Sequence, residues 1–440
     1  MSQEEPPSLL QHPKAQALLA DATLTAAAVR HCQQHLSQFL QRYLPLFYRK
    51  EQSELATVVL QGRLSGLERK TSEPIANQAS RPRKPVQHFV GAGLWDDEAV
   101  MAELRRHVAE ELGDPHAVLV FDSSGFPKKG TQSCGVARQW CGRLGKIDNC
   151  QVGVFATYAA PGGHAPLDRC LYLTKDSAAD RKQRRKTHVP KEVIYREKWR
   201  IALDLLDRSG PDVPHAWITG DDEFGRPTEF RAELRLRREH YVLDVPSNTS
   251  VREVAERPGG GRPPFEPVDA WAARQPASRW KTITIRAGEQ GPLKVRTLKR
   301  RVQTKDDEGR VGPAETLVVI RSLGAEGQTW YTLSNARRDE RLPVLVTVHS
   351  ERHRVEEVLQ EGKGEVGLDH YEVRSWVGWH HHMTLSLLAL WFLTLERRRL
   401  GKKNPGVDGG AIAAGVQPVA AHPAPQSRAG RRGGQPRAAA

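Results

Sequence analysis

The chain has 440 residues, more than one compact domain usually holds, and this length predicts two or three modules. Lysine and arginine number 66 against 52 aspartates and glutamates, which gives a formal charge of +14. This balance favours a polyanionic partner, with nucleic acid first among the candidates. The 5 cysteines are odd in number and lack paired C-x-x-C spacing, which argues against a disulfide framework and a zinc site.

The sequence shows neither a secretory signal nor a membrane span. Residues Met1–Leu10 are polar and lack the apolar segment of a signal peptide. The longest apolar stretch, Met383–Leu395, is shorter than the roughly 18 to 20 residues that a membrane span requires. We therefore expect a cytoplasmic protein with reduced thiols and no membrane partner, in which Met383–Leu395 is part of a core helix.

The first part of the chain is mostly helix-forming. Between Leu24 and Leu67, apolar residues recur three and four apart and give one apolar face. The stretch Ser72–Pro85 contains Pro and Arg and lacks periodicity, which predicts a linker. We therefore expect residues 1–85 to form an N-terminal helical, DNA-binding module and its linker.

Residues 86–247 alternate between helical and strand-like patterns. A helix is predicted over Asp96–Gly113, with acidic residues in its first turn and a terminal Gly. The expected elements that follow are strands at Ala117–Phe121, Gln151–Tyr158 and Cys170–Thr174, a helix at Lys191–Leu206, a strand at Ala216–Thr219, a helix at Thr228–Arg237 and a strand at Tyr241–Val245. This βββαβαβ order predicts an α/β fold with an RNase H-like core.

Beyond this segment the pattern changes twice more. Residues 248–348 combine Pro- and Gly-rich loops with alternating strands at Thr282–Arg286, Thr316–Ile320 and Thr329–Leu333, which predicts a β-rich insertion that interrupts the core. Residues 349–400 return to helices, at Arg352–Gly362 and Trp376–Leu395, and should complete the core. The last residues, 401–440, are dominated by Gly, Ala, Pro and Arg, which predicts a disordered tail.

Two aspartates each end a predicted buried strand. Asp122 follows Ala117–Phe121, and Asp221 follows the strand that ends near Gly220. An unpaired carboxylate there is costly unless it meets a cation or hydrogen-bond donors, so both positions suggest metal ligands. The alternative interpretation, for either residue taken alone, is that the Asp simply caps a turn after a strand.

A third carboxylate lies in the run HSERHRVEEVLQEGK, which begins at His349. Arg352 and Glu356 are four residues apart, so on one helix their side chains project together, and Lys363 lies seven further on. We expect all four side chains on nearby faces, as a metal ligand beside phosphate-binding groups. A solvated helix with an ordinary ion pair is the alternative for an arbitrary Arg/Glu pair.

The spacing of this run resembles the Y-(2)-R-(3)-E-(6)-K signature of bacterial insertion-sequence transposases, with His349 in the place of Tyr. The segments that resemble the insertion-sequence 701 family of DDE transposases are FYRKEQSELATVVLQGRLSGLERK, FDSSGFPKKGTQSCGVARQWCGRLGKIDNCQVGVF, ITGDDEFG and EGKGEVGLDHYEVRSWVGWHHHMTLSLLA. The resemblance implies that Asp122, Asp221 and Glu356 are the catalytic carboxylates. Asp222 and Glu372 are substitutes for the second and third.

The resemblance also implies a reaction, cofactors and partners. The carboxylates would bind two Mg²⁺ or Mn²⁺ ions for cleavage at the ends of a mobile element and strand transfer into target DNA. The partners would be double-stranded DNA, as terminal inverted repeats and as target, and a second copy of the chain, in the nucleoid of a bacterial cell. Two alternatives stay open: a degenerate copy that only binds DNA, and a related nuclease of the same fold.

Other basic residues are candidates for phosphate contacts. Lys128 and Lys129 follow the first aspartate in the sequence FDSSGFPKKG, and with His349, Arg352 and Lys363 they make the predicted DNA-binding set. Two adjacent lysines in a turn are as often plain solvated charge. The same two interpretations apply to the basic run RKQRRK, which is predicted to be a loop.

Overall fold

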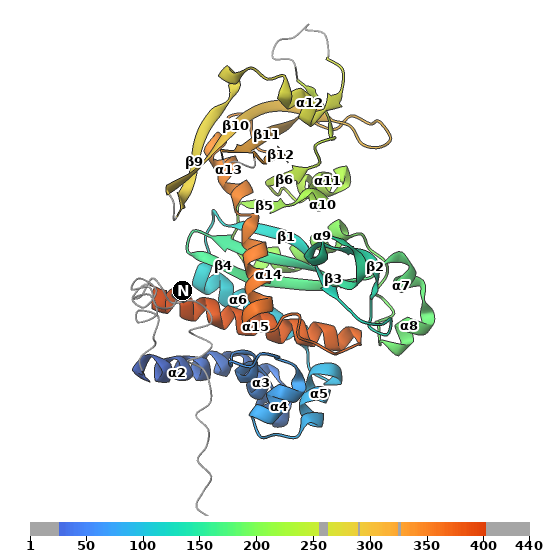
Figure 1. Cartoon of the computed structure of the whole chain (residues 1–440), viewed down its shortest axis with the longest axis vertical. Coiled ribbons are helices and arrows are strands. Elements are labelled where there is room, and N and C mark those ends of the chain that lie inside the picture. The colour runs from blue at the N-terminus through green and yellow to red at the C-terminus, as the bar shows by residue number, and fades with distance from the viewer. Residues whose placement is uncertain (1–25, 255–262, 289–290, 324–326, 402–440) are drawn as a thin grey trace, which may run out of the picture.

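A computed structural model of the chain describes residues 26–254, 263–288, 291–323 and 327–401. Figure 1 shows an elongated molecule with N-terminal helices at one end, a sheet with its helices in the middle, and a strand-rich part at the other end. The predicted disordered tail lies outside the described residues, except for Gly401. All five cysteines are free thiols, as expected.

The N-terminal part is helical, as predicted. Its helices are α2 (Ala26–Tyr43), the 3-10 helix η2 (Leu44–Leu46), α3 (Lys50–Arg63), α4 (Ser72–Gln78) and α5 (Arg83–Ala92). The predicted linker at 72–85 is wrong, because α4 and the start of α5 occupy most of it. Pro74 and Pro85 are the third residues of these two helices, where the backbone N–H has no partner within the helix and proline is tolerated.

The central sheet has the predicted RNase H-like order. Its strands are β1 (Val118–Pro127), β2 (Ala137–Cys141), β3 (Lys146–Ala160), β4 (Gly163–Tyr172), β5 (Trp217–Gly220) and β6 (Tyr241–Val245). Five of them lie in the order β4–β3–β1–β5–β6, with β1, β5 and β6 parallel and β3 antiparallel to both β1 and β4. The sixth, β2, pairs antiparallel with the start of β3. The predicted α/β class with an RNase H-like core is therefore confirmed.

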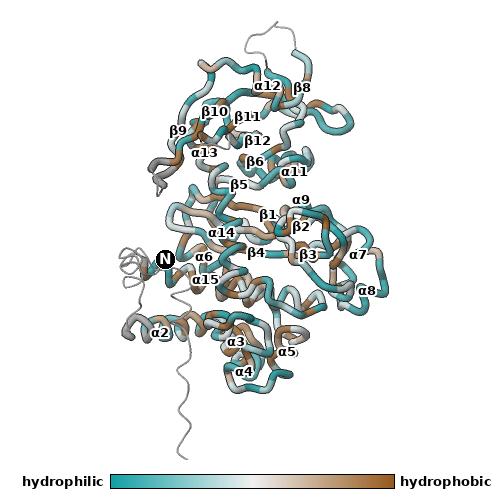
Figure 2. Tube along the Cα trace, viewed as in Figure 1, coloured by the Kyte–Doolittle hydropathy of each residue, from teal (hydrophilic) through white to brown (hydrophobic). Residues whose placement is uncertain are grey.

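Helices cover this sheet and connect its strands. They are α6 (Asp97–Leu112), the 3-10 helix η3 (Gly142–Leu144), α7 (Lys175–Ala179), α8 (Arg181–Lys186), α9 (Lys198–Ser209), the 3-10 helix η4 (Gly210–Asp212), α10 (Asp222–Gly225) and α11 (Thr228–Leu236). The predicted helix at Asp96–Gly113 is α6, and Asp96 caps it by accepting hydrogen bonds from the backbone of its first turn. The basic run at 181–186 is a short helix, not a loop, and Figure 2 shows it as hydrophilic.

Three elements of the core differ from their predicted bounds. Strand β1 continues past Asp122 to Pro127, because its polar residues still pair with β3. The short hairpin strand β2 has too few apolar residues to be predicted from alternation. The helix expected at Lys191–Leu206 begins only at Lys198, since the preceding residues form a turn and an extended stretch.

The insertion continues the central sheet instead of forming a separate one. Its elements are β7 (Ser250–Glu253), β8 (Glu266–Pro267), α12 (Val268–Ala273), the 3-10 helix η5 (Ala277–Arg279), β9 (Lys281–Gly288), β10 (Gly291–Thr304), β11 (Glu315–Ser322) and β12 (Thr329–Ser334). Strand β12 pairs with β6, so twelve strands form one sheet. A small apolar core of its own, with Trp271 and Leu298, fills this end.

Three helices complete the fold: α13 (Leu342–Ser350), α14 (His353–Glu365) and α15 (Trp376–Gly401). Helix α14 contacts β1, β3 and β4, and α15 lies between β4 and the N-terminal helices α2, α3 and α5 (Figure 1). Residues of α15 from Met383 to Leu393 are buried, as the core-helix prediction requires. In the described part of the chain, no helix is long and apolar enough to cross a membrane.

Candidate active site

Asp122 lies where the sheet divides. The parallel pairing of β1 with β5 ends at Phe121 opposite Gly220, whereas the antiparallel pairing of β1 with β3 continues to Pro127. Beyond this point one edge of β1 has no strand beside it, and the side chains there can face a cavity. The Asp122 Oδ1 atom accepts a hydrogen bond from the backbone N–H of Ser123 at 2.7 Å.

Asp221 is held at the end of the neighbouring strand. It caps α10, and its Oδ1 atom accepts a hydrogen bond from the backbone N–H of Glu223 at 3.0 Å. Gly225 allows this short helix to pack directly on β6, because a Cβ atom there would lie 1.8 Å from the carbonyl oxygen of Asp244. The sequence ITGDDEFG therefore fixes Asp221 beside Asp122.

A pocket of about 630 Å³ brings the three predicted carboxylates together: Asp122, Asp221 and Glu356 all line it. Burial and the negative charges of Asp221 and Glu356 raise the pKa of Asp122 to about 8. Burial and the charges of Glu223 and Asp222 raise the pKa of Asp221 to about 7. Negative charge is thus in excess in this pocket, and a cation would relieve it.

The arrangement of the third carboxylate differs from the other two. The Glu356 side chain is 56% exposed and pairs with Arg352, whose Nη1 atom lies 3.0 Å from Glu356 Oε1. Within the residues that the structure describes, no three His, Cys, Asp or Glu side chains stand close enough together to hold one metal ion. The Asp122 and Asp221 carboxyl groups fit a divalent cation by charge and donor type, and Glu356 would join them by turning away from Arg352.

Arg352 and His349 are tied to a residue that the sequence did not indicate. The prediction that they share a helix is wrong: His349 lies in α13, and Arg352 is at the turn before α14. Both contact Asp244 of β6, at 2.9 Å from His349 Nδ1 and 3.3 Å from Arg352 Nε. Burial would lower the pKa of Arg352, but the charges of Asp244 and Glu356 outweigh it and raise that pKa.

None of the three predicted lysines lines the pocket, but Lys363 contacts a residue that does, Ser124. Lys363 Nζ donates to Ser124 Oγ at 2.8 Å, and burial lowers its pKa. Lys128 is turned to Tyr371, with its Nζ atom 3.2 Å from the ring centroid. Lys129 is exposed.

The two substitute carboxylates have separate surroundings. Asp222 lines the pocket and pairs with Arg226 at 3.1 Å. Glu372 lies elsewhere, exposed and paired with Arg69 at 2.7 Å.

Comparison with known proteins decides the family. A family model described as DDE superfamily endonuclease matches residues 42–303, more than half of the chain. The chain belongs to the DDE superfamily endonucleases. The matched stretch contains Asp122 and Asp221, and Glu356 lies after it.

The chain is also similar to the probable transposase for insertion sequence element IS701 of Microchaete diplosiphon. The two are 30% identical over 216 residues, which cover 48% of this chain and 56% of the relative. The chain thus spans about half the length of the curated relative that it matches. The two findings confirm the resemblance to the insertion-sequence 701 family, and endonucleases of this superfamily use divalent metal ions.

Sequence reasoning missed a polar network on the other side of Asp221. The Glu223 carboxylate accepts a hydrogen bond from Ser123 Oγ at 2.6 Å and pairs with Lys198 of α9. Lys198 is the first residue of α9. The sequence predicted a helix over Lys191–Leu206, in which Lys198 is an ordinary interior residue, so no sequence feature indicated a role for it. Glu223 could have been found as the third acid of the run after Gly220.

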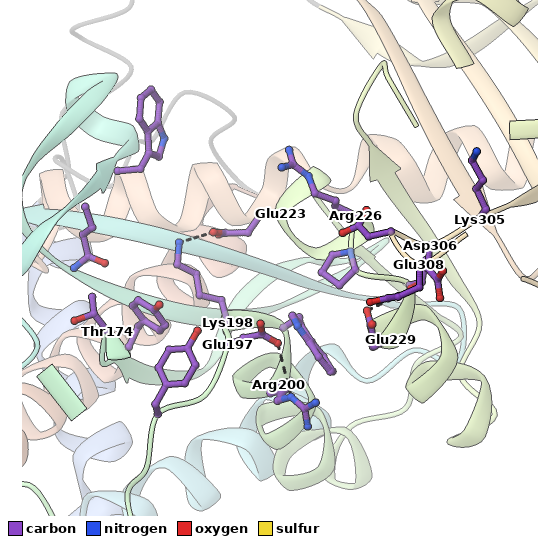
Figure 3. Close-up of a pocket in the computed structure, with 18 residues that line it drawn as sticks. Thr174, Glu197, Lys198, Arg200, Glu223, Arg226, Glu229, Lys305, Asp306 and Glu308 are labelled. Atoms are coloured by element: carbon purple, nitrogen blue, oxygen red, sulfur yellow. Dashed lines mark hydrogen bonds and ion pairs between the residues drawn. The ribbon is translucent and has the colours of Figure 1, made fainter. Parts of the chain in front are cut away.

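A second cavity of about 670 Å³ adjoins the pocket of the three carboxylates, and the two share four lining residues, Trp140, Lys198, Glu223 and Arg226. Figure 3 shows Lys198 pointing to Glu223 on one side of this cavity and Asp306 and Glu308, from the turn after β10, on the other. The insertion therefore forms one wall of the approach to the carboxylates. Trp140 is 60% exposed at the rim.

Proposed function

We propose that this endonuclease is a DNA transposase that cuts the ends of an insertion sequence and joins them to target DNA. Asp122, Asp221 and Glu356 are its catalytic carboxylates. The observation that supports this most strongly is that three acids from separate strands and a helix, 99 and 135 residues apart in the chain, line one pocket. The family and the similarity to the transposase of IS701 support the same function.

The carboxylates would hold two Mg²⁺ or Mn²⁺ ions, which supply Lewis-acid stabilisation of the charge that develops on the scissile phosphate. Arg352, which pairs with Glu356, and Lys363, which donates to Ser124, bind phosphate oxygens. Arg352 has a second role, since it neutralises Glu356 until substrate enters. His349 and Asp244 hold the Arg352 guanidinium in place.

The substrate is double-stranded DNA, in the form of terminal inverted repeats and a target. Cutting two ends in concert requires two active sites, so we propose that a homodimer forms on DNA in the nucleoid of a bacterial cytoplasm. Lys128 and Lys129 have unequal parts in binding. Lys129 is exposed and can reach a phosphate, whereas Lys128 is engaged with Tyr371.

The test is cleavage of DNA that carries the native ends of the element, with Mg²⁺, by the wild type and by Asp122→Asn. We expect the variant to bind the DNA but to cut it at least about a thousandfold more slowly, because a metal ligand is lost. Glu372→Gln is the matched control, because it neutralises an exposed acid outside the pocket. Wild-type cleavage that persists in Asp122→Asn would overturn the assignment.

One observation favours a second candidate, a copy that binds DNA without cutting it. Glu356 is paired with Arg352 instead of facing Asp122 and Asp221. The same assay distinguishes the two candidates, because binding by the wild type with no Mg²⁺-dependent cleavage would support the second one.

A further inference from the structure

Buried cations in this protein fall into two groups. Five lysine or arginine residues of the described chain are buried: Arg63, Lys70, Arg105, Arg169 and Arg231. A buried charge is expensive unless a carboxylate or another anion balances it. The last three of them obey this rule, because each forms ion pairs with buried or half-buried carboxylates such as Asp168 and Glu315.

Arg63 and Lys70 are the exceptions. In the described part of the chain, neither has a carboxylate oxygen within 4.0 Å, although they are only 2% and 5% exposed. The guanidinium of Arg63 donates to the Val366 carbonyl at 3.2 Å and to His382 Nδ1 at 2.9 Å, and its Nε atom has no hydrogen-bond partner among the described residues. Lys70 Nζ donates to the carbonyl of Ser65.

Among the described residues around the two cations, no carboxylate balances their charge at contact distance. The His382 Nε2 atom faces the carbonyl of Leu368 and its Nδ1 atom faces Arg63, so the ring is neutral with its proton on Nε2. Burial lowers the pKa of Arg63 to about 9. Burial also lowers the pKa of Lys70 to about 8, and Glu365 offsets only part of this.

Both cations line one cavity of about 410 Å³, which we call the cation pocket. It lies between the N-terminal helices and the segment before α15, away from Asp122, Asp221 and Glu356. Its polar lining includes the hydroxyl groups of Thr71 and Ser72. The only acid that lines it, among the described residues, is Glu372, which is already paired with Arg69.

We propose that the cation pocket binds a phosphate group, with Arg63 and Lys70 as its charged ligands and the hydroxyl groups of Thr71 and Ser72 as neutral donors. Two cations beside hydroxyl donors suit an oxyanion with several acceptor atoms. The bound group joins α3 and the chain before α4 to α15 through Arg63 and His382. It therefore stabilises the attachment of the N-terminal helices to the core. This site is independent of the proposed catalytic carboxylates.

The test measures the melting temperature of the full chain in inorganic phosphate and in sodium chloride of equal ionic strength. We expect a saturable rise with phosphate that chloride does not reproduce. In Lys70→Met the affinity for phosphate should fall about tenfold, because a charge-assisted hydrogen bond is lost. Lys84→Met, which removes an exposed charge of α5, is the matched control and should keep the wild-type affinity.

A structural role for Lys70 predicts a different result. If Lys70 serves only the fold, Lys70→Met is less stable than the wild type in every buffer. If Lys70 binds the anion, the melting temperature of the variant without phosphate is equal to or higher than that of the wild type, because an uncompensated charge is gone. In saturating phosphate, the melting temperature of the variant is lower than that of the wild type. Thr71→Val keeps the shape and charge of the pocket and should weaken phosphate binding less than Lys70→Met.

Duplex DNA distinguishes the two sources of such a group. Weaker duplex binding by Lys70→Met than by Lys84→Met, with competition from phosphate, identifies a phosphate of the DNA backbone. Equal duplex binding by the two variants identifies a free phosphate or a small phosphorylated molecule. The proposal is overturned if phosphate and chloride act alike on the wild type, or if Lys70→Met responds to phosphate as the wild type does. Asp122→Asn should keep the phosphate response, so this test does not depend on the proposed function.

Discussion

At the scale of single residues, Asp244 connects the proposed catalytic pocket to the core. It lies on β6 and accepts contacts from His349 Nδ1 and Arg352 Nε. Without this carboxylate, the Arg352 guanidinium would have only Glu356 as an ion-pair partner among the residues that the structure describes. In the proposed function, Asp244 thus holds Arg352 where it pairs with Glu356 before substrate binds and with a phosphate afterwards.

This role makes a prediction about Asp244→Asn. The substitution keeps the shape of the side chain and removes its charge, so Arg352 is held less firmly. We expect single-turnover cleavage to slow by about 10- to 100-fold, the usual cost of losing a residue that orients a functional group, with little change in DNA affinity. Asp339→Asn, at an exposed ion pair with Arg337, is the control. Equal rates for the two variants would exclude the positioning role.

At the scale of secondary-structure elements, one carboxylate joins β4 to the helices that cover it. Asp168 of β4 is fully buried and accepts hydrogen bonds from Arg208 of α9 at 2.8 Å. It also contacts Arg105 of α6 and accepts from Ser209 Oγ at 2.5 Å. Burial would raise the pKa of Asp168, but Arg208 and Arg169 outweigh it and hold that pKa below its ordinary range.

We predict that Asp168→Asn lowers the free energy of unfolding by about 3 to 5 kcal/mol at neutral pH, because the buried arginines lose their counter-charge. A carboxyl group with a lowered pKa stabilises the fold above its ordinary pKa, and this contribution is lost as the pH falls through the folded value. The deficit of the variant should therefore be constant near neutral pH and shrink below about pH 4.

Urea unfolding at several pH values measures this deficit. Asp207→Asn is the control, since it breaks an exposed pair with Arg237 and should cost no more than about 1 kcal/mol. A deficit that stays unchanged into acid would show that Asp168 does not act through its charge.

The sequence predicts some elements well and others poorly, for physical reasons. Apolar periodicity identified α6, β5, β6 and α11 nearly to the residue, because burial on a defined face determines them. It missed β10 (Gly291–Thr304). Apolar and polar residues alternate in its sequence KVRTLKRRVQT, but the many cations there do not indicate a strand. Apolar periodicity also missed α13, because the Val and Thr residues of this helix favour a strand, and a helix was expected only from Arg352 on.

The candidate site was predicted in the same uneven way. Strand ends placed Asp122 and Asp221 beside each other, since neighbouring parallel strands end at one edge of a sheet. Asp244 and Lys198 could not be predicted, because their roles depend on contacts between elements far apart in the sequence. Arg63 and Lys70 of the cation pocket lie in one of the segments that carry the family resemblance, but no spacing there marks them as anion ligands. They stand out only because, among the described residues, they lack carboxylate partners.

At the scale of the whole molecule, the insertion and the core share one sheet. Strand β12 pairs with β6 over Tyr331–Ser334 and Val242–Val245. The buried pair of Arg231 and Glu315 adds a second connection, and Glu315 also accepts from Tyr241 of β6 at 2.6 Å. The insertion is therefore rigidly attached to the core, and its residues line the cavity beside the carboxylates.

We predict that the insertion and the core open as one cooperative unit. Native-state hydrogen exchange should give the backbone amides of β6, β11 and β12 similar free energies of opening, because their hydrogen bonds belong to one ladder. If the free energy of opening is much lower for the amides of β11 and β12 than for those of β6, the insertion moves independently of the core.

The central claim is that Glu356, although paired with Arg352 here, acts with Asp122 and Asp221. The most direct measurement is the single-turnover rate of Mg²⁺-dependent cleavage by Glu356→Gln, compared with Glu357→Gln on the next position of the same helix. Glu357 pairs with Arg354 at 2.8 Å and does not line the pocket. We predict that the first variant loses at least about a thousandfold in rate and the second keeps most of it. Similar rates for the two variants would contradict the account.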